Sequence, residues 1–298
     1  MVSGVSKHFG GVQAVDDVSL TAGAGEIVGI IGPNGAGKTT LFELLSGFTV
    51  PDTGTVMFKG EDVSGCSPDE RARRGLIRSF QDPLLFPTLT VTEALTLSLE
   101  RAVPTRFVPS MFGLQRRERD KEAIARELVA LMGLEPYRSK QVRALSTGTR
   151  RITELACIVA LQPTVLLLDE PSSGIAQRES EALGELLLRL RDHLHATFLV
   201  IEHDIPLLMG LSDRVIAMDS GRVIADGLPK EVRNHPAVVE SYLGGDVRAI
   251  ERSGLHVVTA HANGAAHRCA ATTRRGDQCT RLAVDGDTCT QHARVAVG

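Results

Sequence analysis

A glycine-rich loop between an apolar run and a helical segment is the part of this chain best suited to chemistry. Residues 26–31 form the apolar run, and residues 41–45 begin the helix. Glycines let successive backbone N–H groups point inward, and a helix N-terminus adds partial positive charge at the same place. We therefore expect a phosphate cradle made of Gly32, Pro33, Asn34, Gly35, Ala36, Gly37, Lys38, Thr39 and Thr40.

Two residues of this loop have side chains that fit specific tasks. The spacing follows the phosphate-loop pattern, in which the lysine, here Lys38, reaches the β- and γ-phosphates. The Thr39 hydroxyl would complete the coordination shell of a Mg²⁺ ion. The alternative is a glycine-rich turn that carries a lysine by chance, and the strand before the loop and the helix after it disfavour that alternative.

A second pair of reactive residues follows a run of three leucines at residues 166–168. Asp169, at the carboxyl end of this expected buried strand, is placed to hold Mg²⁺ through water. Glu170 can point at a water in line with the γ-phosphate and polarise it. Taken alone, the two acids could merely cap a strand, but together with the phosphate loop they predict nucleotide hydrolysis.

Length and composition are those of an ordinary soluble protein. The chain has 298 residues, 43% of them apolar, and a formal net charge of -3, so nothing in the charge calls for nucleic acid as a partner. No apolar stretch approaches the roughly 18 residues that span a bilayer, and the first residues show no secretory signal. We expect the protein to stay in the cytosol.

Strand-like and helix-like segments alternate as an α/β fold requires. Expected strands cover residues 12–20, 55–58, 164–168 and 197–201, and a hairpin joins 215–218 to 222–225. Helical spacing covers residues 93–101, 116–132, 150–160 and 180–194. The strands at 164–168 and 197–201 are continuous apolar runs, which is typical of a parallel sheet covered on both faces. The first two helical segments form an insert in this core.

Four further motifs give an order and spacing that resemble an ATP-binding cassette, the nucleotide-binding subunit of ABC transporters. They are Phe9, Gln81 in the run 79–82, the segment 145–149 before a helix, and His203 after a buried strand. The resemblance covers residues 1–245. It implies an α/β P-loop NTPase fold: a RecA-like core with a mostly parallel sheet, an antiparallel β subdomain, and a helical subdomain at about residues 82–145.

The resemblance also implies roles for these residues. Phe9 would stack on adenine, the alternative being a core Phe at a strand end. Gln81 would touch Mg²⁺ and the attacking water and pass movement to the helical subdomain. Ser146 and Gly148 would donate from a hydroxyl and an N–H to a γ-phosphate bound on a partner chain, although Ser146 also fits a helix cap. His203 would contact the γ-phosphate, although a single His is more often structural.

These assignments define the expected site. The expected cofactors are ATP and Mg²⁺. The expected catalytic residues are Lys38, Gln81, Glu170 and His203. The expected Mg²⁺ ligands are Thr39, Gln81 and Asp169.

Three runs, 7–15, 77–81 and 235–244, are more closely similar to importer ATPases of the branched-chain amino acid type. This similarity implies a second cassette as partner, in a homodimer or a heterodimer. It also implies two membrane permease subunits and, indirectly, an extracytoplasmic substrate-binding protein. The chain would then lie in the cytoplasm, peripheral on the inner face of the plasma membrane. Amides, urea or other small solutes fit the sequence as well as branched-chain amino acids do.

Some residues depart from the family pattern. Thr147 and Thr149 replace the usual glycine and glutamine of the signature segment, and Ala176 stands where many relatives have aspartate. The alanine removes an expected contact across the dimer, so a slower cassette or an asymmetric heterodimer becomes plausible. The chain also begins only a few residues before Val5, so we expect little of the family's first strand.

A different functional class also fits a lone cassette. A soluble ABC ATPase acting on ribosomes or DNA is the alternative to an importer subunit. Such proteins usually carry two cassettes or a long coiled-coil insert, and this chain has neither, which favours the transporter reading. A cassette that only binds ATP is disfavoured because Lys38, Glu170 and His203 are all present.

The last fifty or so residues lie outside the family match. Residues 246–266 lack periodicity and fit a linker. Within residues 267–298, the stretch from Cys269 to His292 contains three thiols and one imidazole, a complete tetrahedral set for structural Zn²⁺. So short a segment cannot build an adequate apolar core, and metal would have to supply its folding energy. A disordered tail with idle cysteines is the alternative. The expected ligands are Cys269, Cys279, Cys289 and His292.

Overall fold

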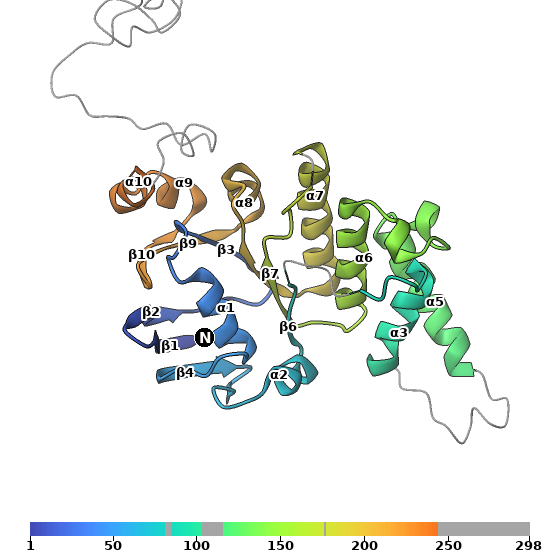
Figure 1. The fold of residues 1–298 in the computed structure, drawn as a ribbon, viewed down its shortest axis with the longest axis horizontal. Helices are drawn as coiled ribbons and strands as arrows, with labels where there is room; N and C mark the ends of the chain where they lie inside the picture. The colour runs from blue at the N-terminus through green and yellow to red at the C-terminus, as the bar shows by residue number, and fades with distance from the viewer. Residues whose placement is uncertain (81–84, 103–115, 176, 244–298) are drawn as a thin grey trace, which may run out of the picture. The chain divides into compact units, whose positions relative to one another are not determined.

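The computed structural model describes residues 1–80, 85–102, 116–175 and 177–243. All of these residues lie within one compact unit, Met1–His256. They form two sheets with helices packed around them (Figure 1). Three expectations, the linker, the zinc ligands and the assignments to Gln81 and Ala176, fall outside the described residues.

A four-stranded antiparallel sheet carries the N-terminus. Its strand order is β2-β1-β4-β5. Val2 and Val5 on β1 are buried, because this strand pairs with β2 on one side and β4 on the other. The expectation of little first strand is therefore wrong, since eight residues of β1 are in place. The strands are β1 (Val2–Phe9), β2 (Val12–Leu20), β4 (Thr53–Phe58) and β5 (Glu61–Asp62).

The second sheet has six strands in the order β10-β9-β3-β8-β7-β6. Every neighbouring pair is parallel except β9 and β10, which form the expected antiparallel hairpin. Ile201 of β8 pairs with both Ile30 of β3 and Asp169 of β7, so the carboxyl ends of these three strands meet at one edge. The strands are β3 (Ile27–Ile31), β6 (Leu76–Arg78), β7 (Val165–Asp169), β8 (Thr197–Ile201), β9 (Arg214–Asp219) and β10 (Arg222–Gly227).

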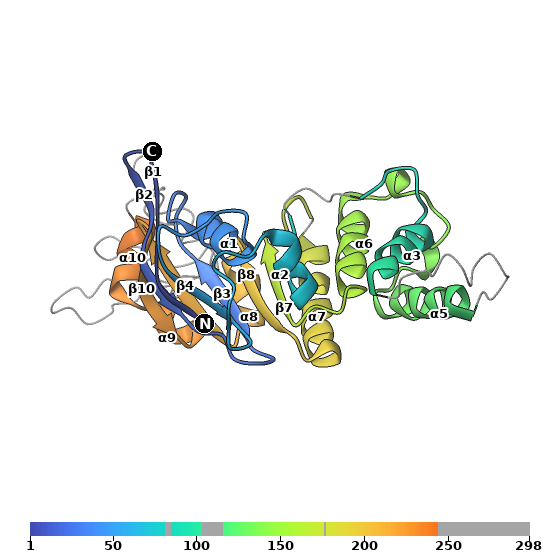
Figure 2. The same cartoon turned by 90° about the horizontal axis from the view of Figure 1, so that it is seen from below.

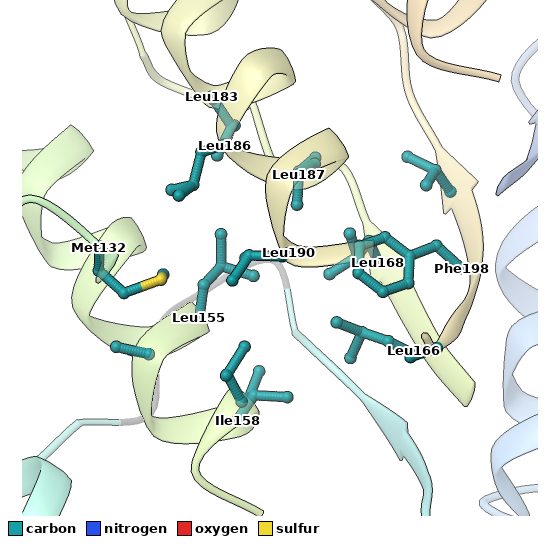
Figure 3. Packing of buried hydrophobic residues seen from close by; sticks show 14 of the residues in the cluster. Met132, Leu155, Ile158, Leu166, Leu168, Leu183, Leu186, Leu187, Leu190 and Phe198 are labelled. Atoms are coloured by element: carbon teal, nitrogen blue, oxygen red, sulfur yellow. The ribbon is translucent and has the colours of Figure 1, made fainter. Parts of the chain in front are cut away.

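Both faces of the six-stranded sheet are buried, as its continuous apolar strands predict. Leu166 and Leu168 of β7 pack with one hydrophobic cluster and Leu167 between them packs with the other. Figure 3 shows the first cluster, in which Leu183, Leu187 and other side chains of α7 lie over β7 and β8. The second cluster lies against α1 and the antiparallel sheet.

Helices occupy both faces of the core and the inserted subdomain. They are α1 (Lys38–Ser46), α2 (Pro68–Arg74), α3 (Val91–Ala102), α5 (Arg116–Leu131), α6 (Thr147–Val159), α7 (Gln177–Leu194), α8 (Ile205–Leu211), α9 (Pro229–Arg233) and α10 (Pro236–Leu243). Two short 3₁₀ turns, Glu135–Tyr137 and Val142–Ala144, precede α6. No helix in the described ranges is long and apolar enough to cross a bilayer.

Helices α3 and α5 coincide with the predicted helical segments 93–101 and 116–132 to within two residues at each end. Helices α3 and α5 pack together beside α6, at the end away from the antiparallel sheet (Figure 2). Helix α6 begins three residues before the predicted start at residue 150, because Ser146 caps its first turn and accepts the N–H of Thr149 at 3.2 Å. Helix α7 likewise begins three residues before the predicted residue 180.

Candidate active site

The glycine-rich loop runs from the end of β3 to the first turn of α1, as expected. A Cβ atom at Gly32 would come within 2.2 Å of the Met218 carbonyl oxygen. Gly37 caps α1 with a φ of 93°, and a Cβ there would lie 2.3 Å from the Ala14 carbonyl oxygen. Only glycine fits at these two positions. The loop is therefore held close to neighbouring backbone while the N-terminus of α1 faces its interior.

The side chain of Lys38 folds back into the phosphate loop, where it is expected to bind phosphate. Its Nζ donates to the carbonyl oxygens of Gly32 at 2.7 Å and Pro33 at 3.0 Å. Burial lowers the pKa of Lys38, and the nearby carboxylates of Glu170 and Asp169 act in the opposite direction. The charges of both acids thus act on the ammonium group, for which a phosphate would be a stronger partner than two carbonyls.

Asp169 ends β7 with a side chain that suits a Mg²⁺ ion. The residue is 2% exposed, and its Oδ2 accepts from Nη2 of Arg78 at 2.7 Å. Its Oδ1 is buried without a hydrogen-bond partner. Buried carboxylate oxygens are nearly always satisfied, so an orphan one indicates a missing ligand, and Mg²⁺ prefers such an oxygen. Thr39 is exposed and lies in the first turn of α1.

Glu170 and His203 meet across the ends of β7 and β8. The Nε2 atom of His203 lies 2.9 Å from Oε1 of Glu170. Glu170 has a φ of 48°, a left-handed conformation that is uncommon for a non-glycine residue and that turns its side chain at the strand end. Both side chains keep some exposure, 19% for Glu170 and 54% for His203. A substrate water could therefore reach the carboxylate.

Glu202 fixes the segment on which His203 sits. The residue is buried, which raises the pKa of its carboxyl group. One of its oxygens accepts the Ser172 N–H at 2.6 Å, and the other accepts the Ser172 hydroxyl at 2.8 Å. The loops that follow β7 and β8 are thereby joined beside the contact between Glu170 and His203.

The signature segment presents Ser146 and Gly148 at the start of α6. Ser146 is exposed, and it serves as a helix cap because its Oγ accepts the Thr149 N–H at 3.2 Å. Its Oγ also lies 2.9 Å from the Oγ1 of Thr149. A Cβ at Gly148 would lie 2.9 Å from Oε2 of Glu179. Ser146 caps the helix and is exposed at the same time, so its hydroxyl is accessible to a ligand from outside the chain.

Phe9 lies at the end of β1 and is 49% exposed. The Nζ atom of Lys7 lies 5.7 Å from the centroid of the Phe9 ring. The alternative that Phe9 is a core residue at a strand end is thus disfavoured, because a core Phe would be buried. An exposed ring at a strand end can stack on a planar base.

Three residues that were not among the predicted site residues make contacts within the site. Arg78 pairs with Asp169, and Arg151 on α6 bonds several carbonyl oxygens around it. The hydroxyl of Tyr242 on α10 accepts the Gly32 N–H at 2.8 Å, and burial raises the pKa of Tyr242 to about 12. Two sequence positions could have indicated the arginines. Arg78 lies three residues before Gln81, and Arg151 lies two residues after the signature segment.

Gln81 is expected to bind Mg²⁺ together with Asp169. Gln81 lies outside the described residues, but Ser79 and Phe80 precede it directly. Ser79 donates its N–H to the Leu167 carbonyl at 2.8 Å, which fixes the chain leading to Gln81 beside β7. Among the residues that the structure describes, no three or more His, Cys, Asp and Glu side chains group together as a metal site.

Family models match two parts of this chain. Residues 15–173 match the model described as ABC transporter. Residues 222–248 match the model described as branched-chain amino acid ATP-binding cassette transporter. The first match contains the phosphate loop, the signature segment and the two acids Asp169 and Glu170, and the second contains Tyr242.

Individual proteins match most of the chain. The branched-chain amino acid transport ATP-binding protein LivG of Salmonella typhimurium is 39% identical over 82% of this chain and 96% of its own length. BraF of Pseudomonas aeruginosa is 36% identical over the same shares of the two chains. Among solved structures, the ADP conformation of MJ1267, an ATP-binding cassette of an ABC transporter, superposes with a TM-score of 0.69 at 29% identity, covering 82% of this chain and 97% of that one.

Proposed function

The chain belongs to the ABC transporter ATP-binding family, and from this membership we propose that it hydrolyses MgATP in a site completed by a second cassette. It is an ATPase that energises an importer. The proposal assigns the hydrolytic site to the edge where β3, β7 and β8 end. The observation that carries it is the contact between Glu170 and His203 beside a buried Asp169 oxygen without a partner.

The phosphate loop holds the nucleotide in this proposal. Backbone N–H groups from Gly35 to Thr39 surround the phosphates, and Lys38 exchanges its two carbonyl partners for phosphate oxygens. Phe9 stacks on the adenine. Thr39, Asp169 and Gln81 would hold Mg²⁺, which would supply positive charge against the phosphates.

Glu170 and His203 act on the water that attacks the γ-phosphate. Glu170 accepts a proton from that water, or polarises it, as a general base. His203 keeps the carboxylate oriented through the 2.9 Å contact and presents its imidazole to the γ-phosphate. The segment tied by Glu202 keeps the two groups together, because Glu202 joins both loops.

A second cassette completes the site. Ser146 is exposed and Gly148 is buried two residues further along, at the N-terminus of α6. From there we propose that the Ser146 hydroxyl and the Gly148 N–H donate to a γ-phosphate bound on another copy or on a related chain. ATP that favours the closed pair over the open pair can do mechanical work, and hydrolysis then releases the pair. Two membrane permease subunits receive this movement at the inner face of the plasma membrane.

We propose branched-chain amino acids or similar small polar solutes as the cargo. The match of residues 222–248 and the names of the similar proteins support this choice. An extracytoplasmic binding protein would deliver the cargo to the permease. We also propose that residues 1–245 form the nucleotide-binding domain, 246–266 a linker, and 267–298 a zinc module with Cys269, Cys279, Cys289 and His292.

The test is capture of the full chain carrying Glu170→Gln from native membranes in the presence of ATP and Mg²⁺. The substitution slows hydrolysis and holds the closed pair, so partners stay bound. Lys38→Met is the matched control, because it removes nucleotide binding while the membrane-facing surface is unchanged. Two polytopic permease proteins recovered with both variants, and a second cassette enriched only with Glu170→Gln, are the expected result.

Two outcomes would count against the proposal. Recovery of ribosomal or DNA-repair proteins from the soluble fraction, without permeases, would identify a different class of ABC ATPase. Equal recovery of the second cassette with both variants would mean that ATP does not drive the pairing. The cargo is then assigned by uptake of radiolabelled leucine, amides and urea in cells with and without the gene for this chain.

A further inference from the structure

Arg151 is the most extensively bonded side chain around the candidate site. It lies on α6 and is 3% exposed. Its Nε donates to the Pro171 carbonyl at 3.3 Å, and Nη2 donates to the carbonyls of Asp169 at 3.0 Å and Glu170 at 3.4 Å. Its Nη1 donates to the Phe80 carbonyl and, at 2.6 Å, to Oε2 of Glu154. The guanidinium therefore touches three separate segments.

These segments carry the chemistry of the site. Asp169, Glu170 and Pro171 form the strand end that presents the Mg²⁺ ligand and the general base. Phe80 is the described residue next to Gln81, and α6 begins at the signature segment. A single buried group thus fixes the distance between the helical subdomain and the strand end.

Electrostatics explain why a guanidinium can be buried there. Glu154, one turn along α6, is buried with Arg151, and burial raises the pKa of the Glu154 carboxyl while Arg151 acts against that rise. This ion pair neutralises the charge of Arg151. The remaining N–H groups are then free to bond the carbonyl oxygens, which a planar fork of donors can do from one position.

Glu170 needs such support because of its backbone. A non-glycine residue with φ of 48° persists only where the surrounding structure determines it. Its N–H donates to the Ile201 carbonyl at 2.9 Å, and its carbonyl receives Nη2 of Arg151 at 3.4 Å. The peptide on either side of Glu170 is therefore held, and the side chain is aimed at His203.

We propose that Arg151 is a positioning residue for hydrolysis, which holds the Asp169–Glu170–Pro171 backbone and the Phe80 carbonyl against α6. The inference rests on the proposed role of Glu170 as general base. Arg151 itself touches neither nucleotide nor water in this proposal. It acts by keeping the catalytic carboxylate at its angle to the attacking water.

The test compares Arg151→Lys with Arg71→Lys in the full chain. The lysine at 151 keeps the charge opposite Glu154 but cannot reach the separate carbonyls at once. Arg71 is a matched control, because it is also fully buried and also bonds backbone carbonyls, those of Leu44 at 2.6 Å and Leu45 at 2.8 Å. Its partners lie at the far end of α1. Hydrolysis is measured per folded molecule, with ATP affinity measured separately.

We expect kcat of Arg151→Lys to fall about 10- to 100-fold, as small misplacements of catalytic groups do, with the Kd for ATP within about twofold of wild type. Arg71→Lys should lower the unfolding midpoint and leave kcat unchanged. If the two variants lose stability alike and both keep wild-type kcat, Arg151 is only structural and the proposal is overturned.

A second measurement does not depend on hydrolysis. Amide hydrogen exchange of residues 169–173 should speed up in Arg151→Lys and not in Arg71→Lys. Unchanged exchange would overturn the positioning role even if kcat fell. A wild-type chain that binds ATP without hydrolysing it, alone and with its permease, would instead contradict the role of Glu170, and the exchange result would still decide the case of Arg151.

Discussion

The Nε2 atom of His203 and the Oε1 atom of Glu170 lie 2.9 Å apart, although the residues come from different strands. The contact exists because β7 and β8 are parallel neighbours, with Asp169 opposite Ile201. Glu170, one residue after Asp169, and His203, two residues after Ile201, therefore leave the sheet close to each other. A carboxylate and an imidazole in such contact form a base with an orienting partner.

The first prediction concerns this base. Glu170→Gln keeps the shape of the side chain but cannot accept a proton, so ATP hydrolysis should fall about 100-fold or more. ATP binding should persist, because the phosphate loop is untouched. Phosphate release and nucleotide binding by fluorescence measure the two effects. Glu181→Gln, on the exposed surface of α7, is the control, and equal loss in both variants would rule out a specific role for Glu170.

The second prediction concerns Arg78 and Asp169. Arg78→Met leaves the buried carboxylate of Asp169 without its only described partner, so the free energy of unfolding should fall by about 3 kcal/mol. Urea unfolding without nucleotide measures it. Arg73→Met breaks an exposed pair with Asp69 and should change stability by less than about 1 kcal/mol. A similar small change in both variants would show that Asp169 does not depend on Arg78.

The third prediction uses pH to detect the buried charge of Lys38. Burial lowers the pKa of Lys38 in the folded state, so the unfolded chain binds this proton more tightly. The burial penalty is present below the folded pKa and disappears as pH rises toward the ordinary lysine value. Relative to Lys38→Met, the wild type should therefore gain stability as the pH rises toward the ordinary lysine pKa of about 10.4.

Urea unfolding without nucleotide at several pH values measures this trend. Lys59→Met, which changes an exposed lysine, is the control and should show no comparable trend relative to wild type. A stability difference between wild type and Lys38→Met that stays constant over the pH range would contradict the assignment.

The fourth prediction concerns Tyr242. Tyr242→Phe removes the hydroxyl that accepts the Gly32 N–H, which leaves a partly buried donor unpaired and should cost about 1–2 kcal/mol of unfolding free energy. ATP affinity should weaken in parallel, because Gly32 begins the phosphate loop. Tyr137→Phe is the control on a partly buried ring outside the site. Unchanged ATP affinity in Tyr242→Phe would show that α10 does not influence the loop.

Local sequence signals predicted the elements that carry the site. The three leucines before Asp169 indicate a buried strand, and β7 spans Val165–Asp169 against a predicted 164–168. The phosphate loop was predicted from glycine spacing, and the structure places it between β3 and α1. Such features depend on residues that are adjacent in the chain, so they can be predicted from one sequence alone.

Contacts between distant segments were not predictable in the same way. The bonds from Arg151 to Phe80 and Glu170 depend on how α6 packs against the sheet, and no local pattern encodes that packing. The hydrogen bond between Tyr242 and Gly32 likewise joins residues that are 210 positions apart in the sequence. The first strand was underestimated for a related reason, since β1 is held by β4, which lies much later in the sequence.

The position of β3 sets the order in which this protein can be assembled on the ribosome. The strand that leads into the phosphate loop is flanked by β8 and β9, which are translated long after it. Contacts between distant segments form late, because loop closure must precede them. A nascent chain that has not yet emerged past β9 therefore lacks at least one of the two strands that flank β3. We expect fragments that end before β9 to lack ATPase activity for the same reason.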